Sequence, residues 1–539
     1  MLRLNQKRLR SLSRDRDFLV RSSIGIIAAS TIVALIIWFA FGSRQDWYEE
    51  RVKLAQRGEV EMLDAIREAE TIIYREMGEK NQKAIEDWPH NPGGTVEAAS
   101  LPKFVKMELV PTIRNWIGGS ELSPESGELF ETYARARYSG TEAERRMARA
   151  ELTTLVTANS RRPFVNECVG DLEFEEGQFE AANRHFETEL EIRESAHAAS
   201  RLVETALVQN ELERLRELLA QPKIRRSTSV LVRFEAFSKL RDYAGIFETV
   251  LVHDYAGLSL AYVGLTFFVA MVWFFIVGQF SGFRSDQLLI YGAAILLGVF
   301  SATLTLFVVI VQEEVFGLFP ENGDFVQGLI NNVAGIGLRE EFIKLVCFIP
   351  LIPALLRRSN PVEALVVAGF VGLGFAVQEN LSYYSRSGGN ATVARFLSAN
   401  FFHLAMTGLV GYAAYRFAQL PQRRWEELLA TFLTVVLAHG IYDALLTLPE
   451  FMEHSWLSLI VFAVLAYRFF GVAHSLPLTW RQELSPLGIF VIGTSLLIGV
   501  TLNVVCYGEV PYPGYVLFLL SCVQLVPTAF IFINTFRSS

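Results

Sequence analysis

The second half of this chain is a succession of long apolar stretches, and this feature limits the fold more than any other. The stretches lie near residues 257–280, 286–311, 332–356, 361–384, 393–418, 426–448, 455–473, 486–507 and 513–535, and another covers residues 24–41. Each is about long enough to cross a ~30 Å hydrocarbon core as a helix. Hydrophobic residues make up 51% of the 539-residue chain, which is unusual for a soluble protein. We therefore predict an all-α polytopic membrane protein with about ten transmembrane helices.

The basic residues predict how these helices are oriented, because cytoplasmic loops carry an excess of Lys and Arg. We expect residues 1–22 to form a basic cytoplasmic leader, residues 23–42 a transmembrane anchor and residues 43–250 an extracytoplasmic domain. Later loops agree, since Arg357, Arg358, Arg423, Arg424 and Arg468 fall in predicted inner loops and Glu313, Glu321 and Glu450 in outer ones. Both termini are then cytoplasmic, and the expected location is the cell membrane, namely a bacterial inner membrane. A cleaved signal peptide is the alternative for the first stretch, although "WFAFGSR" is a poor cleavage site.

Residues 43–250 are predicted to be helical and to resemble a tetratricopeptide repeat, most clearly at residues 160–250. The stretch "NECVGDLEFEEGQFEAANRHFETEL" carries small and aromatic residues at similar spacings: Gly170, Gly177, Phe179, Ala182 and Phe186. In such repeats, small residues let two antiparallel helices approach and aromatic residues fill the groove between them. The match is partial, because Asn166 stands where the first helix usually carries a large aromatic residue, so a generic helical bundle is the alternative. We expect this domain to bind a protein partner, and we expect no nucleic-acid partner.

Four consecutive apolar stretches contain ionisable groups in their interiors. They are Arg339, Glu340, Glu341 and Lys344 in the first, Glu379 with Asn380 in the second, His403 in the third, and His439 with Asp443 in the fourth. A charge at bilayer depth costs at least ~2.5–3.5 kcal/mol. With a rise of ~1.5 Å per residue, Glu340, Glu379, His403 and His439 fall within ~8 Å of one another along the membrane normal, in the outer half of the bilayer. One shared polar site is the interpretation that explains both observations.

The spacing of these residues constrains the geometry of the site. Glu340 and Lys344 are four residues apart, as are His439 and Asp443, so each pair shares one helix face. Glu340 and Glu341 are about 100° apart on a helix, which leaves open which of them faces the site. Lys344 is expected to be a counter-ion for the glutamates and Asn380 to support helix packing. The glycines at 369, 372 and 374 would let their helix pack closely on a neighbour.

Carboxylates together with two histidines favour hydrolysis. No Ser or Cys stands in a setting that suggests a nucleophile, so water activated by Glu and His is the leading interpretation, and it requires no cofactor. A divalent metal such as zinc, held by His403, His439 and Glu340, would do the same work. The residues alone leave these two routes open.

At these positions the sequence resembles a known family. "EEFIK" is similar to an EExxK motif, "FAVQEN" to FxxxEN, and His403 and "HGIYD" to the third and fourth motifs of the PrsW family of intramembrane proteases, distant relatives of the type II CAAX prenyl endopeptidases. The resemblance covers roughly residues 260–450. It identifies residues 255–450 as an intramembrane protease core and leaves residues 451–539 as additional transmembrane helices.

The resemblance implies an endopeptidase that cuts a membrane protein substrate near the extracytoplasmic side, in the manner of site-1 cleavage of an anti-sigma factor. By that analogy Glu340 and Glu341 supply the carboxylate that activates water, and Glu379 and His403 assist. His439 with Asp443 would position or stabilise the oxyanion. The prenyl endopeptidases differ at the second and fourth motifs, with His in place of Glu379 and Asn in place of Asp443. That difference argues against a prenylated substrate.

Two other classes of protein remain open from the sequence. The first is an ion- or proton-coupled membrane transporter or sensor that uses the same groups as a relay, with the helical-repeat domain as receptor. No inverted repeat is visible, and the charged stretches form one contiguous block, which argues against it. The second is an inactive scaffold, which the intact motif set argues against.

Overall fold

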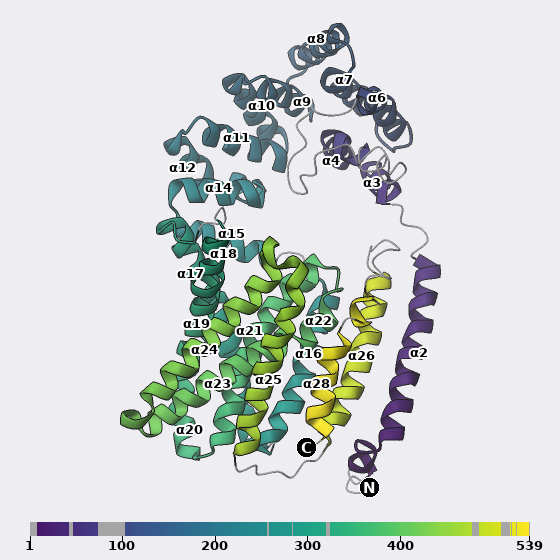
Figure 1. The fold of residues 1–539 in the computed structure, drawn as a ribbon. Coiled ribbons are helices and arrows are strands. Elements are labelled where there is room, and N and C mark those ends of the chain that lie inside the picture. The colour runs from purple at the N-terminus through teal and green to yellow at the C-terminus, as the bar shows by residue number, and fades with distance from the viewer. Residues whose placement is uncertain are drawn as a thin grey trace. The chain divides into compact units, whose positions relative to one another are not determined.

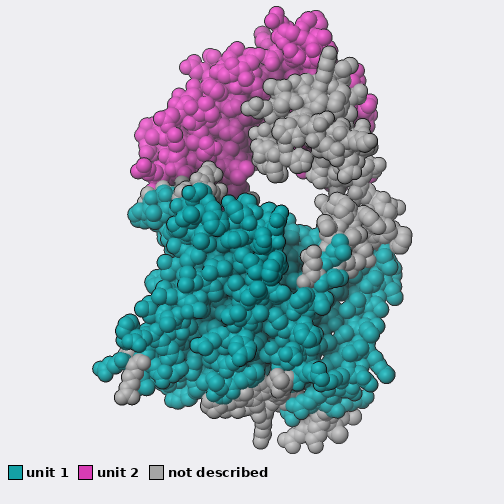
Figure 2. All heavy atoms as spheres, in the orientation of Figure 1, with its two compact units in different colours: residues 1–43, 251–539 teal, residues 44–250 magenta. Residues whose placement is uncertain are grey.

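The described part of the chain is helical and falls into two units. The computed structural model describes residues 8–41, 47–73, 103–255, 258–282, 284–319, 324–476, 484–507, 518, 520–523 and 525–537. Contacts between residues separate residues 1–43 and 251–539, here called unit 1, from residues 44–250, here called unit 2 (Figure 2). No β-strand occurs in the described ranges, and the predicted all-α class is confirmed.

Eight helices among the described residues are long and apolar enough to cross a membrane. They are Arg16–Ile37, Leu260–Ser281, Ser285–Glu313, Pro361–Arg386, Thr392–Gln419, Arg424–Thr447, Pro449–Ser475 and Pro486–Cys506. The chain is therefore a multi-pass membrane protein, as predicted. The last predicted stretch, 513–535, lies partly outside the described residues and includes helix α28 (Val526–Arg537).

The predicted stretch 332–356 is not one continuous α-helix. It consists of a π-helix, η7 (Asn331–Leu338), then α19 (Arg339–Phe348), a 3-10 turn, η8 (Ile349–Leu351), and α20 (Ile352–Arg358), and α18 (Phe325–Ile330) precedes it. Pro350 and Pro353 donate no backbone hydrogen bond, which accounts for the change of helix type near residue 350. π-Helical turns inside α-helices frequently occur at functional sites, and this one ends at Leu338, directly before Arg339.

Helix α21 (Pro361–Arg386) lies at the centre of unit 1 and is buried over most of its length. It packs against α23 (Ala399–Gln419), α17 (Leu288–Ile310) and α16 (Leu260–Gly278). The crossing with α17 brings two glycines together: a Cβ on Gly374 would lie 2.1 Å from the carbonyl oxygen of Ile295, and one on Gly298 would lie 2.1 Å from that of Val371. Such contact requires the absence of side chains, as predicted for the glycine run.

The remaining helices of unit 1 pack around this centre (Figure 1). They are α2 (Arg16–Phe41), α22 (Thr392–Leu397), α24 (Pro421–Thr447), α25 (Ser458–Ser475) and α26 (Pro486–Tyr507). Helix α2 lies along α26, where Asn503 Nδ2 donates to the carbonyl oxygen of Ser30 at 3.4 Å. Helix α2 begins at Arg16, within the segment assigned to the leader. It begins at the end of the bundle at which α28 finishes (Figure 1).

Unit 2 consists of short helices joined by turns. They are α3 (Trp47–Ala55), α4 (Glu59–Arg67), α6 (Lys103–Gly118), α7 (Pro124–Tyr138), α8 (Glu142–Ala158), α9 (Val165–Glu175), α10 (Phe179–Ile192), α11 (Ala196–Val208), α12 (Leu212–Ala220), α13 (Pro222–Ser227), α14 (Val230–Leu240) and most of α15 (Tyr243–Tyr255). Gly170 on α9 faces Phe186 on α10, where an added Cβ would lie 2.8 Å from the ring. This is the small-residue contact expected from the sequence; the tetratricopeptide resemblance itself stays a prediction.

A buried cluster of charges joins α4 to α9 in unit 2. Arg67 pairs with Glu167 at 2.6 Å and with Asp171 at 2.9 Å, and both carboxylates are almost fully buried. Arg193 also pairs with Glu167, and His197 with Asp171. Because each buried carboxylate has cationic partners, the desolvation of these charges is compensated within the unit.

Candidate active site

All six residues predicted to be catalytic lie in one connected network inside unit 1. Helix α19 carries Glu340 and Glu341, α21 carries Glu379, α23 carries His403, and α24 carries His439 and Asp443. These elements come from separate parts of the sequence, so the network forms only when the bundle is assembled. The inference of one shared polar site agrees with this geometry.

Lys344 lies at the centre of the network with its side chain fully buried. Its Nζ is 3.1 Å from Glu340 Oε2, 2.9 Å from Glu341 Oε1 and 3.0 Å from His403 Nδ1. It also lies 3.7 Å from the ring centroid of Phe375. An ammonium has three donors, and three acceptors meet them here, so the charge is compensated without water. Lys344 is therefore placed as the counter-ion that the sequence suggested.

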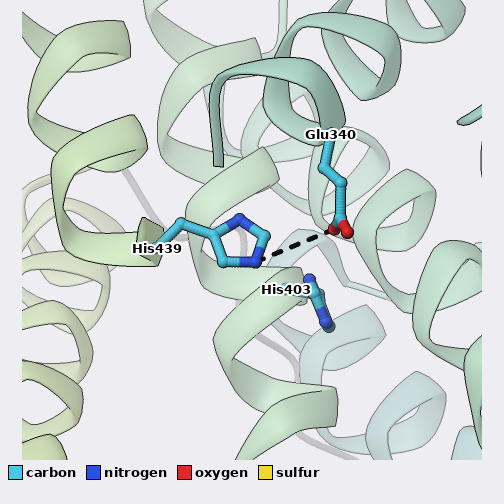
Figure 3. A group of neighbouring side chains, drawn as sticks. All are labelled: Glu340, His403 and His439. Atoms are coloured by element: carbon cyan, nitrogen blue, oxygen red, sulfur yellow. Dashed lines mark ion pairs between the residues drawn. The ribbon is translucent and has the colours of Figure 1, made fainter. Parts of the chain in front are cut away.

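His439 connects the two neighbouring glutamates. Its Nδ1 is 3.0 Å from Glu341 Oε1, and its Nε2 lies 3.2 Å from Asp443 Oδ2 and 3.7 Å from Glu340 Oε2. Figure 3 shows the rings of His403 and His439 and the carboxylate of Glu340 gathered around a common space. The four-residue spacing of His439 and Asp443 thus produces a direct contact, as the shared helix face predicted.

His403 and Glu379 form the second arm of the network, and Arg395 holds it in place. Glu379 Oε2 is 2.9 Å from His403 Nε2 and 2.9 Å from Arg395 Nη2. Arg395 Nε donates to Asn380 Oδ1 at 2.7 Å, and its guanidinium lies 3.9 Å from the ring centroid of Tyr383. Arg395 therefore contacts three residues on one face of α21 and holds Glu379 in a fixed orientation.

Two asparagines close a ring of hydrogen bonds around Arg395. Asn380 Nδ2 donates to Asn400 Oδ1 at 2.9 Å, and Asn400 Nδ2 donates to the carbonyl oxygen of Arg395 at 2.7 Å. Asn380 does support helix packing, but it also binds Arg395. Arg395 and Asn400 were missed as site residues. The signal available for Arg395 was that it is one of few basic residues near a predicted outer helix end.

Glycines beside the two histidines fix the helix crossings at the site. A Cβ on Gly372 would lie 2.2 Å from the carbonyl oxygen of His403, so α21 and α23 touch through backbone atoms at that histidine. A Cβ on Gly440 would lie 2.4 Å from Cα of Val333, so α24 touches the π-helix one residue after His439. Each histidine therefore lies beside a point where two helices touch through backbone atoms.

A cavity of about 260 Å³ opens beside the network, between α17, α19 and α21. Its lining includes Arg339, Glu340, Phe375, Glu379 and Tyr383, whereas Glu341 and the two histidines are not part of the lining. The side chains of Glu340 and Glu379 are 11% and 24% exposed, compared with 1% for Glu341. The two carboxylates that a molecule in this cavity would meet are thus Glu340 and Glu379.

The residues present fit a divalent metal. Glu340, His403 and His439 each offer one ligand atom, and these atoms lie within 4.8 Å of one another. Two histidines and a carboxylate are a ligand set of catalytic zinc sites. The network also has an excess of negative charge, because its four carboxylates face two permanent cations, Lys344 and Arg395. Glu341 Oε2 is buried without a hydrogen-bond partner in the described part of the chain.

Fold and site together define a polytopic membrane protein with a carboxylate and histidine centre enclosed by its helices. Residues 287–468 match the sequence model of a family described as "PrsW family intramembrane metalloprotease". The matched segment contains the whole network and excludes unit 2 and helix α26. The predicted resemblance of this segment to the PrsW family is confirmed, and proteins of that family are peptidases.

Two curated relatives carry the same family name. "Protease PrsW" of Geobacillus kaustophilus (strain HTA426) is 30% identical over 92 residues, which is 17% of this chain and 41% of the relative. "Protease PrsW" of Clostridioides difficile (strain 630) is 29% identical over 143 residues, 24% of this chain and 57% of the relative. The matches thus span about half the length of these relatives. No solved structure matches the chain.

Proposed function

We propose that this protein is an intramembrane endopeptidase that hydrolyses a peptide bond of a membrane-bound substrate near the extracytoplasmic side. The observation that carries the proposal is the cavity that Glu340 and Glu379 line together, with Lys344 and the histidines buried behind them. Peptide hydrolysis needs a carboxylate next to space for water and a scissile bond, and this cavity supplies both. The family of the matched segment supports the same chemistry.

Glu340 is the carboxylate we assign to water activation. It lines the cavity, and Lys344 and His439 hold its Oε2 from the opposite side. A carboxylate in this position can take a proton from water and return it to the leaving amine. Glu341 serves as an anchor, because its one bonded oxygen contacts both Lys344 and His439.

Glu379 is the second carboxylate in the cavity, and its orientation is fixed. Arg395 and His403 both contact its Oε2, and its other oxygen, which accepts no hydrogen bond from the described part of the chain, would face a substrate. Arg339, which follows the π-helix and lines the same cavity, donates to Gln312 Oε1 through Nη1. Its positive charge stands where it can stabilise an oxyanion on the scissile carbonyl.

The metal-dependent route is the second way to activate the water: a divalent metal, with zinc as the first candidate, would be held by Glu340, His403 and His439, and Glu340 would then be a ligand and not the base. When bound there, the metal would polarise the scissile carbonyl and lower the pKa of water. Lys344, Glu341 and Asp443 hold these three residues in place through contacts of 2.9–3.2 Å. Arg395 keeps Glu379 directed toward the cavity.

The charges of the chain support a proposal for its placement in the cell. We propose that both termini are cytoplasmic, in the inner membrane of a bacterium, and that the site lies in the outer half of the bilayer. The common end of α2 and α28 in Figure 1 supports this, as do the basic residues of α2 and of α20. Unit 2 would then be extracytoplasmic, and we propose that it recruits or restrains a protein partner, with a membrane anti-sigma factor as the expected substrate.

Trapping the substrate tests this function. Cells carrying full-length Glu340→Ala protein should accumulate an uncleaved membrane protein that co-purifies with the variant and can be identified by mass spectrometry. The trapped protein should then be cut in liposomes by the wild type and not by Glu340→Ala, Glu379→Ala or His403→Ala. Full cleavage by all three variants would refute the assignment. Proton-driven uptake by the wild type with no cleavage of the trapped protein would favour a transporter.

A further inference from the structure

A second cavity in unit 1 lies away from the network, between α23, α24 and α25, with the edge of α28. Its volume is about 1090 Å³. One face consists of small residues on α24, namely Ala430, Thr431, Thr434 and Ala438, and the other of residues on α25, among them Ile460, Val464, Arg468 and Gly471. The proposed function makes no use of this cavity.

The polar residues of this cavity gather at one end. Arg416 lies in the last turn of α23, Glu427 near the start of α24, and His474 in the last turn of α25, with Arg468 two turns before that end. The opposite end, near Leu409 and Val461, is apolar. Figure 1 shows α24 and α25 separating toward the end of the bundle at which α20 lies, which is the charged end.

The charges at that end leave a positive excess. One carboxylate oxygen of Glu427 accepts a hydrogen bond from Arg416 at 2.7 Å, and the other accepts one from Arg424 at 2.8 Å. Both oxygens of Glu427 are therefore occupied. Arg468 makes no ion pair within the described ranges of the chain. A cavity with an apolar floor and, two turns from its charged end, a guanidinium that has no ion pair among the described residues matches a molecule with a hydrocarbon tail and an anionic head.

We propose that this cavity binds an anionic phospholipid, with an acyl chain between α24 and α25 and the phosphate at Arg468. Basic pockets between transmembrane helices on the cytoplasmic side suit anionic headgroups.

Native mass spectrometry of the full-length protein tests the lipid site. The probes are dioleoyl phosphatidylglycerol and dioleoyl phosphatidylcholine, which have the same acyl chains and differ in the charge of the head. We expect the wild type to retain phosphatidylglycerol preferentially. Arg468→Gln should reduce that preference about fivefold, which corresponds to ~1 kcal/mol per basic residue near the membrane surface. Equal retention of both lipids by the wild type would overturn the proposal.

A second variant tests the apolar part independently. Gly471 has nothing within 4 Å of an added Cβ, so Gly471→Leu should fold and fill the cavity, and binding of both lipids should fall. The matched control is Arg284→Gln, an exposed arginine paired with Asp286 that does not line the cavity, and it should bind as the wild type does. Unchanged binding by Gly471→Leu would overturn the site. So would displacement of the lipid by inorganic phosphate, or a protein segment cross-linked in its place.

Discussion

Glu340 and Glu341 are neighbours in the sequence but face different surroundings. Glu340 lines a cavity and contacts Lys344 with one oxygen, whereas Glu341 lies behind it with its side chain 1% exposed, against Lys344 and His439. One residue is therefore open to a substrate, and the other holds the residues around it. The 100° offset along a helix produces two environments from one motif.

The first prediction separates these two roles with isosteric substitutions. Glu340→Gln should lower kcat by about 10²–10⁴-fold, with a smaller fall in the thermal unfolding temperature than Glu341→Gln, because the Glu340 side chain is partly exposed. Glu341→Gln should lower the unfolding temperature as well, because Lys344 and His439 lose a charged partner at a cost of about 3–5 kcal/mol. Cleavage of the trapped substrate and thermal unfolding in detergent measure both. The reverse pattern would exchange the two assignments.

The second prediction concerns Arg395. Arg395→Ala should lower kcat by about 10²-fold with little change in KM, because Glu379 loses the contact that orients it. Arg395→Lys should recover part of the rate, because lysine restores the positive charge but not the planar guanidinium that donates to Glu379 and Asn380 together. Arg416→Ala is the matched control, since Arg416 also pairs with a glutamate on another helix but lies outside the network. If Arg395→Ala and the control lose equal activity, Arg395 has no positioning role.

The third prediction concerns the glycine beside His439. Gly440→Ala should destabilise the protein by about 1–3 kcal/mol and reduce cleavage, because the added methyl meets the backbone of Val333. Gly292→Ala in α17 meets nothing within 4 Å and should be neutral or slightly stabilising. Thermal unfolding and cleavage assays of the two variants provide the comparison. A Gly440→Ala protein as stable and active as the wild type would contradict the close contact.

The fourth prediction concerns metal content. We expect elemental analysis of the purified protein to find about one zinc per chain, and a chelator to remove both the zinc and the cleavage activity. His403→Ala and His439→Ala should lose the metal, whereas Glu379→Gln should keep it because Glu379 is outside the set of three ligands. Full activity of metal-free protein would leave the water-activating role to the side chains alone.

The fifth prediction is a pH dependence of unit 2. Burial raises the pKa of Asp171, but the attraction of Arg67 and His197 outweighs it and holds that pKa well below its usual range. The pKa of Glu167 is lowered in the same way by Arg67 and Arg193. These carboxylates therefore stabilise the folded unit above their ordinary pKa values, near pH 4, and the contribution is lost as the pH falls below that.

Hydrogen exchange of the full-length protein measures this effect. Peptides from α9 and α11 should exchange faster as the pH falls below about 4, after correction for the intrinsic rate, and Asp171→Asn should weaken the dependence. Burial raises the pKa of Glu189. Protonation of Glu189 therefore stabilises the folded unit as the pH falls, and this partly offsets the loss from Asp171 and Glu167. Exchange in α9 that stays constant across this range would show that the ion pairs contribute little.

The sequence alone was enough to predict the all-α class. It was also enough to predict that the four helices with ionisable residues meet at one polar site. Glu340, Glu379, His403 and His439 each interrupt an apolar stretch at a similar predicted depth, and the cost of charged groups in lipid indicated a common site. The rotation of α19 could not be predicted, since a π-helix that ends at Leu338, directly before α19, shifts the phase of the helix. Arg395 was missed as a site residue because its contact with Glu379 depends on how the short helix α22 folds back over α21.

The two helix crossings at Gly372 and Gly440 have a consequence for comparing related chains. Both histidines are positioned by backbone contact, so their separation does not depend on the lipid-facing side chains, which are free to diverge. A homologue could keep every glutamate and histidine of the motifs and still be inactive if a larger residue replaced either glycine. The residue types at these two crossings therefore offer a way to sort active members from degenerate ones.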